Sequence, residues 1–350
     1  MTRIAAVRGV LPEHRYPQGQ ITEAFVAGWG LTGTKKALLE RLHTAVGVRT
    51  RSLALPIGGY AALEGFGGAN DAYITRSVEL GSRALTEALS DAGLAPDDVD
   101  LILTVSTTGL AAPSIDARIA ANVGLRTDVR RVPVFGLGCV GGAAGLARVH
   151  DHLRGWPGHV AVLLSVELCS LTLQRHDLTP ANLVATALFG DGAAAVVVCG
   201  AAHALPGTAS VRATRSRLYP DSGHLMGWNV SGDGFGVMLD PGIPDMVRAH
   251  LADDVRTFLA AHDLTPRDIT TWICHPGGPK IIDAVVETLD LDPEALALTR
   301  TSLQEKGNLS SASVLHVLAD TLAASPPSGG HAVLLALGPG FCAELVLLDW

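Results

Sequence analysis

Three residues of kinds that take part in catalysis stand where apolar runs of this sequence stop. Cys139 follows a glycine turn and begins a small-residue helix, and His275 ends a strand-like run before a Pro-Gly-Gly turn. Asn308 follows a glycine and begins a second helix. The partial positive charge at a helix N-terminus lowers a thiol pKa towards neutrality, which makes Cys139 a candidate nucleophile. A thiolate, an imidazole and an amide donor together form the set that acyl transfer needs.

Each of these residues also has an ordinary structural explanation. Cys139 is compatible with an inert buried cysteine in a Gly/Ala packing helix, His275 with a structural histidine, and Asn308 with a helix N-cap. Because all three fall at the ends of predicted elements, their joint placement favours the catalytic interpretation.

Composition limits the kind of protein to which such a site belongs. The 350 residues are 48% hydrophobic, which suits one large or two fused domains. The net charge of −8 argues against nucleic acid or an anionic membrane surface as the main partner. The first residues lack the pattern of a signal peptide, and no apolar run is long enough for a membrane span. The five cysteines are widely spaced, so neither a disulfide framework nor a metal site is expected, and we predict a cytoplasmic protein.

The sequence contains an internal repeat that positions the candidate residues. Residues 82–109 and 247–278 both run as a helix, a loop with proline and aspartate, and an apolar strand. The helix after Cys139 and the helix after Asn308 each lead through Gly-His to two further apolar strands. This alternation predicts an α/β fold with two duplicated βαβ-rich halves, mixed sheets and helices on both sides. We expect residues 1–205 to carry the cysteine and residues 206–350 to carry the histidine and asparagine.

Five segments resemble the successive signatures of one family, the type III polyketide synthases or chalcone synthase family. They read FGLGCVGGAAGL, ALFGDGAAAVVV, WICHPGGPKII, EKGNLSSASVL and LGPGFCAELV, and they run in that family's order. The resemblance implies a thiolase-like αβαβα fold, a homodimer, and a catalytic site of Cys139, His275 and Asn308. It also implies that Phe189 is an aromatic gate between an entry tunnel and the cavity, with core packing as the alternative.

The implied reaction needs no metal or redox cofactor. A starter acyl group from coenzyme A or an acyl carrier protein loads onto Cys139, and His275 and Asn308 stabilise the enolate formed when malonyl-CoA loses CO₂. For the coenzyme's phosphates we nominate Arg49, Arg51 and Lys280, the last beside Gly277; solvated surface charge is the alternative for these cations. For the cavity wall we nominate Thr107, Cys169, Thr172, Trp228 and Val237.

Departures from the family pattern suggest the product. Val237 stands where the plant enzymes carry a second gating phenylalanine, and an indole at Trp228 would fill cavity space and favour short products. The pattern looks closest to bacterial members that make alkylpyrones, such as germicidin synthase, with the tetrahydroxynaphthalene synthases more distant. The alternatives are a tetrahydroxynaphthalene or alkylresorcinol product, a β-ketoacyl synthase III, a cysteine hydrolase, and a non-catalytic acyl-CoA-binding protein.

Overall fold

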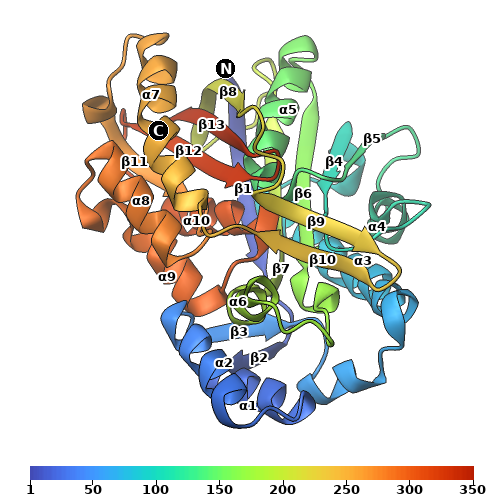
Figure 1. Cartoon of the computed structure of the whole chain (residues 1–350). Coiled ribbons are helices and arrows are strands. Elements are labelled where there is room, and N and C mark those ends of the chain that lie inside the picture. The colour runs from blue at the N-terminus through green and yellow to red at the C-terminus, as the bar shows by residue number, and fades with distance from the viewer.

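The computed structural model describes all 350 residues, and its strands form two half-sheets joined edge to edge (Figure 1). The first half-sheet has the order β1-β7-β6-β4-β5, and the second has the order β8-β13-β12-β11. Their strands are β1 (Thr2–Val10), β4 (Leu101–Val105), β5 (Arg130–Val134), β6 (Val160–Leu168), β7 (Asp191–Cys199), β8 (Ala209–Leu218), β11 (Ile269–Cys274), β12 (His331–Gly338) and β13 (Cys342–Asp349). A short antiparallel contact between β1 and β8 joins the halves.

Helices lie between the facing sides of the two half-sheets, and other helices cover the outer face of each half-sheet. Helices α5 (Gly141–Gly155) and α10 (Ser313–Ala323) form the middle layer, and their apolar side chains pack with strands of both halves. Helices α3 (Gly65–Ala92) and α4 (Ile115–Val123) cover the first half-sheet, while α7 (Ile243–Ala260) and α8 (Pro279–Leu289) cover the second. This is the predicted αβαβα layering, and its sequence order follows the predicted repeat.

Close packing in the middle layer explains the small residues after Cys139. A Cβ at Gly142 would lie 2.3 Å from the backbone oxygen of Ser311, so only glycine fits there. The two central helices therefore begin with their backbones in contact, which brings the residues that precede them together.

The remaining elements surround the edge of this core. Helices α1 (Gln18–Gly28), α2 (Gly33–Ala45), α6 (Pro180–Leu188) and α9 (Ala297–Lys306) lie there with the pair β2 (His14–Pro17) and β3 (Thr50–Leu53) and the hairpin β9 (Met226–Ser231) and β10 (Gly234–Leu239). In Figure 1 this hairpin crosses the view in front of the central strands. No helix combines the length and the apolar character needed to cross a membrane.

Candidate active site

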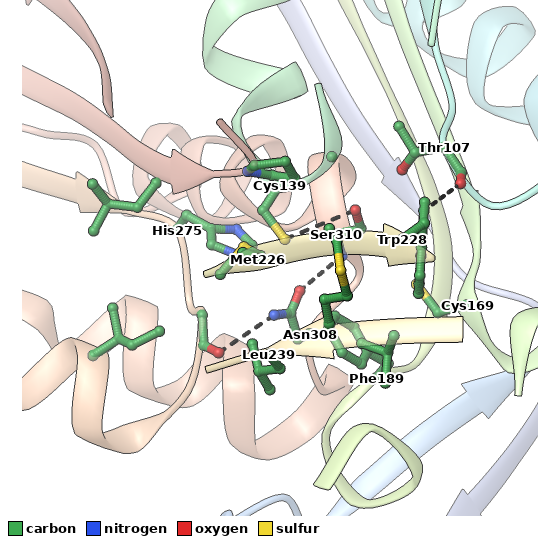
Figure 2. Close-up of a pocket in the computed structure, with 18 of the residues that line it drawn as sticks. Thr107, Cys139, Cys169, Phe189, Met226, Trp228, Leu239, His275, Asn308 and Ser310 are labelled. Atoms are coloured by element: carbon green, nitrogen blue, oxygen red, sulfur yellow. Dashed lines mark hydrogen bonds between the residues drawn. The ribbon is translucent and has the colours of Figure 1, made fainter. Parts of the chain in front are cut away.

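The structure brings Cys139, His275 and Asn308 to one cavity. Cys139 lies in the 3-10 turn Gly138–Val140 before α5, His275 directly follows β11, and Asn308 lies between α9 and the 3-10 turn Ser310–Ala312 before α10. All three side chains are nearly buried, and Figure 2 shows them turned into the cavity. The empty volume is about 790 Å³, including the part open to solvent.

Hydrogen bonds fix the amide of Asn308. Its Oδ1 accepts from the backbone N–H of Ser310 at 2.8 Å, and its Nδ2 donates to the carbonyl of Gly277 at 3.5 Å (Figure 2). Because the amide nitrogen carries two protons, one remains available to a ligand in the cavity. The asparagine lies two residues before the 3-10 turn Ser310–Ala312, and the regular helix α10 begins only at Ser313.

Burial sets the protonation of the other two residues. Loss of hydration lowers the pKa of His275 to about 3, and neither ring nitrogen has a hydrogen-bond partner. The same effect raises the pKa of the Cys139 thiol to about 12, although contacts with Ser310, whose Oγ lies 3.9 Å from Sγ, and with Asn308 oppose it. The expectation of a lowered thiol pKa is therefore wrong, because desolvation outweighs the helix N-terminus. Cys139 and His275 are therefore both neutral at neutral pH, and they line the same cavity with both ring nitrogens of His275 unbonded.

Four of the predicted wall residues line this cavity, namely Thr107, Cys169, Trp228 and Val237. So do the predicted gate Phe189 and Gly277, which was nominated with the coenzyme contacts. Trp228 lies on β9, and its Nε1–H donates to the carbonyl of Thr107 at 2.9 Å (Figure 2). This bond holds the indole along one wall, beside the ring of Phe235 at a centroid distance of 6.0 Å. The hydroxyl of Thr107 is bonded to Glu167 at 3.2 Å.

Two predicted contacts lie elsewhere. Thr172 lines a neighbouring cavity with Phe66 and Phe235, because its hydroxyl turns back to donate to the carbonyl of Cys169 at 2.8 Å. Arg51 is only 1% exposed, so it cannot bind coenzyme phosphates at a tunnel mouth. The reason is that its guanidinium is bonded inside the protein, as described below.

The other two predicted cations are at the surface. Lys280 is exposed in the first turn of α8, two residues after the glycines that follow His275. Arg49 is also exposed, and it pairs with Glu305 at 3.0 Å and donates to Gln304 at 2.7 Å.

The sequence reasoning missed several residues around the site. Ser310 contacts the thiol of Cys139 and has a left-handed backbone conformation with φ of 49°. Glu167 is fully buried and accepts hydrogen bonds from Thr107, Thr108 and Ser311. Further wall residues are Met226, Met238, Leu239, Cys274, Ile281, Val285, Leu335, Leu337 and Pro339. The serines two and three positions after Asn308 in the motif GNLSS were a usable signal, and Glu167 stands within the apolar run VAVLLSVEL.

The layered fold with a cysteine, a histidine and an asparagine at the ends of its core elements defines a thiolase-fold acyltransferase. Residues 66–202 match the sequence model of the N-terminal domain of chalcone and stilbene synthases, and residues 210–349 match that of their C-terminal domain. The chain belongs to this family, the type III polyketide synthases, whose members catalyse acyl transfer with decarboxylative condensation.

Individual relatives refine the comparison. The chain is 58% identical over 352 aligned residues to 1,3,6,8-tetrahydroxynaphthalene synthase of Streptomyces peucetius subsp. caesius, covering 100% of this chain and 93% of that protein. It is 36% identical to a putative chalcone synthase of Bacillus subtilis, covering 87% and 86%. The crystal structure of tetrahydroxynaphthalene synthase from Streptomyces coelicolor A3(2) superposes with a TM-score of 0.93 at 30% identity, covering 99% of both chains. The expectation that these synthases are the more distant relatives is therefore wrong.

Proposed function

We propose that this enzyme builds an aromatic polyketide of the tetrahydroxynaphthalene type from malonyl-CoA, with the growing chain carried on Cys139. The observation that carries this proposal is the 58% identity, along the whole chain, to a tetrahydroxynaphthalene synthase. A naphthalene skeleton has ten carbons, which equals five two-carbon extension units. Malonyl-CoA therefore supplies both the starter and the extenders in this proposal.

Loading begins with the neutral Cys139–His275 pair. The imidazole of His275 takes the thiol proton as Sγ attacks the thioester carbonyl, and the coenzyme thiolate leaves and takes that proton. The products are the Cys139 thioester and free coenzyme A. The geometry supports this role because His275 lines the same cavity as Cys139 and neither ring nitrogen has another hydrogen-bond partner.

Extension uses the same cavity. The free N–H of Asn308 and the imidazole of His275 bind the thioester oxygen of malonyl-CoA, so that loss of CO₂ leaves a stabilised enolate. The enolate carbon bonds to the acyl carbon on Cys139 and the carbon–sulfur bond to Cys139 breaks. The lengthened chain is then on coenzyme A and reloads onto the freed thiol, while the ring of Phe189 separates the cavity from the entry.

Alkylpyrone formation from a fatty acyl starter is a second candidate, because much of the wall is aliphatic. Val237, Ile281 and Val285 line the cavity and suit an alkyl chain. The flat, bonded indole of Trp228 suits a planar aromatic product instead. This difference leads directly to an experiment.

Purified enzyme is incubated with malonyl-CoA alone and with malonyl-CoA plus a panel of acyl-CoA starters, and products are identified by mass. The proposal predicts tetrahydroxynaphthalene from malonyl-CoA alone. Pyrones that form only when an acyl starter is added would favour the second candidate and contradict the first.

For the coenzyme we keep Lys280 and Arg49 as the proposed phosphate contacts. Both are exposed, and Lys280 follows the turn that carries His275 and Gly277. The pairing of Arg49 with Glu305 must loosen for phosphate to bind, so Lys280 has the larger expected share.

We also propose that two copies of the chain pair through β5. This strand ends the sheet with one edge unpaired, and Arg130 to Pro133 are exposed. Val132 and Phe135 present 41% and 49% of their area to solvent there. An open edge with exposed apolar side chains is a template for an identical strand related by a two-fold axis.

A further inference from the structure

Arg51 is an arginine whose whole side chain lies inside the protein. Its Nε donates to Oε1 of Gln18 at 3.0 Å, and one terminal nitrogen donates to the carbonyl of Phe189 at 2.5 Å. The other terminal nitrogen has no partner. Burial lowers the pKa of Arg51 to about 10, and Asp191 favours the charged form, so the group remains a cation at neutral pH. Burying a cation costs free energy unless its hydrogen bonds and charge partners compensate.

The guanidinium lies at the C-terminal end of helix α6. The last carbonyls of a helix have no partner within it, and the helix dipole favours a positive charge there. Three outside donors bind them in succession: the Gln18 side chain bonds Ala187 at 2.9 Å, the Asn308 backbone N–H bonds Leu188 at 2.9 Å, and Arg51 bonds Phe189. The gate residue and the candidate catalytic asparagine are thus joined at one helix end.

The aliphatic part of Arg51 packs against the same junction. A Cβ at Gly307 would lie 3.0 Å from its Cδ, and a Cβ at Gly190 would lie 3.7 Å from its Cβ. These glycines directly flank Asn308 and Phe189. The N–H of Gly190 also donates to the carbonyl of Asn308 at 2.9 Å, which closes the junction from the other side.

We propose that Arg51 is a positioning residue, which sets the ring of Phe189 and the amide of Asn308 relative to each other through the backbone that carries both. It touches no reacting atom. The inference rests on the proposed roles of Phe189 and Asn308. Removing the guanidinium frees the carbonyl of Phe189 and loosens the junction, and a shift of about 1 Å in a catalytic group can cost about 10²-fold in rate. Loading of Cys139 depends on a separate element, the turn before α5, and is spared.

The test uses Arg51→Met and Arg51→Lys in the full chain. Three quantities are measured: acyl loading on Cys139, malonyl-CoA decarboxylation and the product profile. Arg51→Met lowers decarboxylation relative to loading by about tenfold or more and broadens the products, because both the oxyanion donor and the gate move. Arg51→Lys keeps a charge and one donor and falls between this variant and the wild type. The matched control is Arg3→Met, since Arg3 also holds loop carbonyls, including Leu205 at 3.2 Å, but far from the cavity. It lowers the melting temperature without changing the ratio.

A folded Arg51→Met enzyme with the wild-type ratio and products would overturn the proposal. If that variant does not fold, Arg51→Lys and Gln18→Met decide in the same way, because Gln18→Met removes the donor to Ala187 and the acceptor for Arg51. Asn308→Ala runs in the same assay as a reference. If Asn308→Ala leaves decarboxylation intact, the proposed function fails; if it lowers decarboxylation and the Arg51 variants do not, only the positioning role fails.

Discussion

Replacing Trp228 with alanine tests whether the indole limits the space in which the polyketide grows. Trp228 faces the cavity from β9, opposite Val237 in the hairpin register, and its only hydrogen bond goes to the carbonyl of Thr107. Removing the ring enlarges the cavity beside the thioester on Cys139. We expect longer starters to be accepted and extra extension units to appear in the products.

The variant should remain folded. A fully buried tryptophan replaced by alanine loses about 3–5 kcal/mol, and Trp228 is only partly buried because it lines a cavity. Loss of its hydrogen bond adds about 1 kcal/mol. A total of about 2–4 kcal/mol lies below the roughly 5–15 kcal/mol by which domains are stable.

The assay compares product masses from malonyl-CoA with and without acyl-CoA starters, together with thermal unfolding. Trp228→Phe removes the N–H but keeps a ring, so it separates the hydrogen bond from the volume. Trp272→Leu is the control, since Trp272 packs in the core under α7 and α8 and its loss lowers stability alone. A folded Trp228→Ala enzyme with unchanged products would refute the cavity role.

Three other predictions concern Asn308, His43 and strand β5. Asn308→Ala should lower malonyl-CoA decarboxylation by about 10²-fold or more while loading of Cys139 persists. If loading failed and decarboxylation survived, Asn308 would act in loading instead. Burial lowers the pKa of His43 from 6.5 to about 3, so the stability that neutral His43 provides above pH 6.5 is lost as the pH falls towards 3. His43→Gln should therefore reduce the pH dependence of the unfolding free energy in this range by about 1.4 kcal/mol per pH unit. An unchanged pH dependence in urea titrations would contradict this. Val132→Lys on β5 should weaken self-association in sedimentation, whereas Val230→Lys on the exposed hairpin should not; equal behaviour would place the dimer contact elsewhere.

The catalytic set and the layers were predictable because their signals are local. A glycine turn after an apolar run marks the end of a strand, and Cys139 and His275 occupy such ends in the printed sequence. The repeated order of helix, loop and strand predicted two halves, and small residues after Cys139 predicted a helix in close contact with other backbone. Each of these inferences uses residues a few positions apart.

The errors concern residues whose surroundings come from distant parts of the chain. Arg51 was nominated for the coenzyme's phosphates because those phosphates need cations, but its partners are Gln18 and Phe189, the latter 138 positions away. The direction of the Thr172 hydroxyl depends on its hydrogen bond to the carbonyl of Cys169. The thiol pKa of Cys139 depends on how deeply the folded chain buries the thiol. The expectation about which relatives are nearer gave weight to a few wall positions such as Trp228 and Val237, whereas over the whole chain the identity to a tetrahydroxynaphthalene synthase is 58%.

The central claim is that Cys139 carries the growing chain, and mass spectrometry of the intact protein and of its peptides tests it most directly. Wild-type enzyme incubated briefly with malonyl-CoA should gain an acyl mass on the peptide that contains Cys139. Cys139→Ala should remain folded, gain no such mass and make no product. Acylation or turnover that survives in Cys139→Ala would contradict the account.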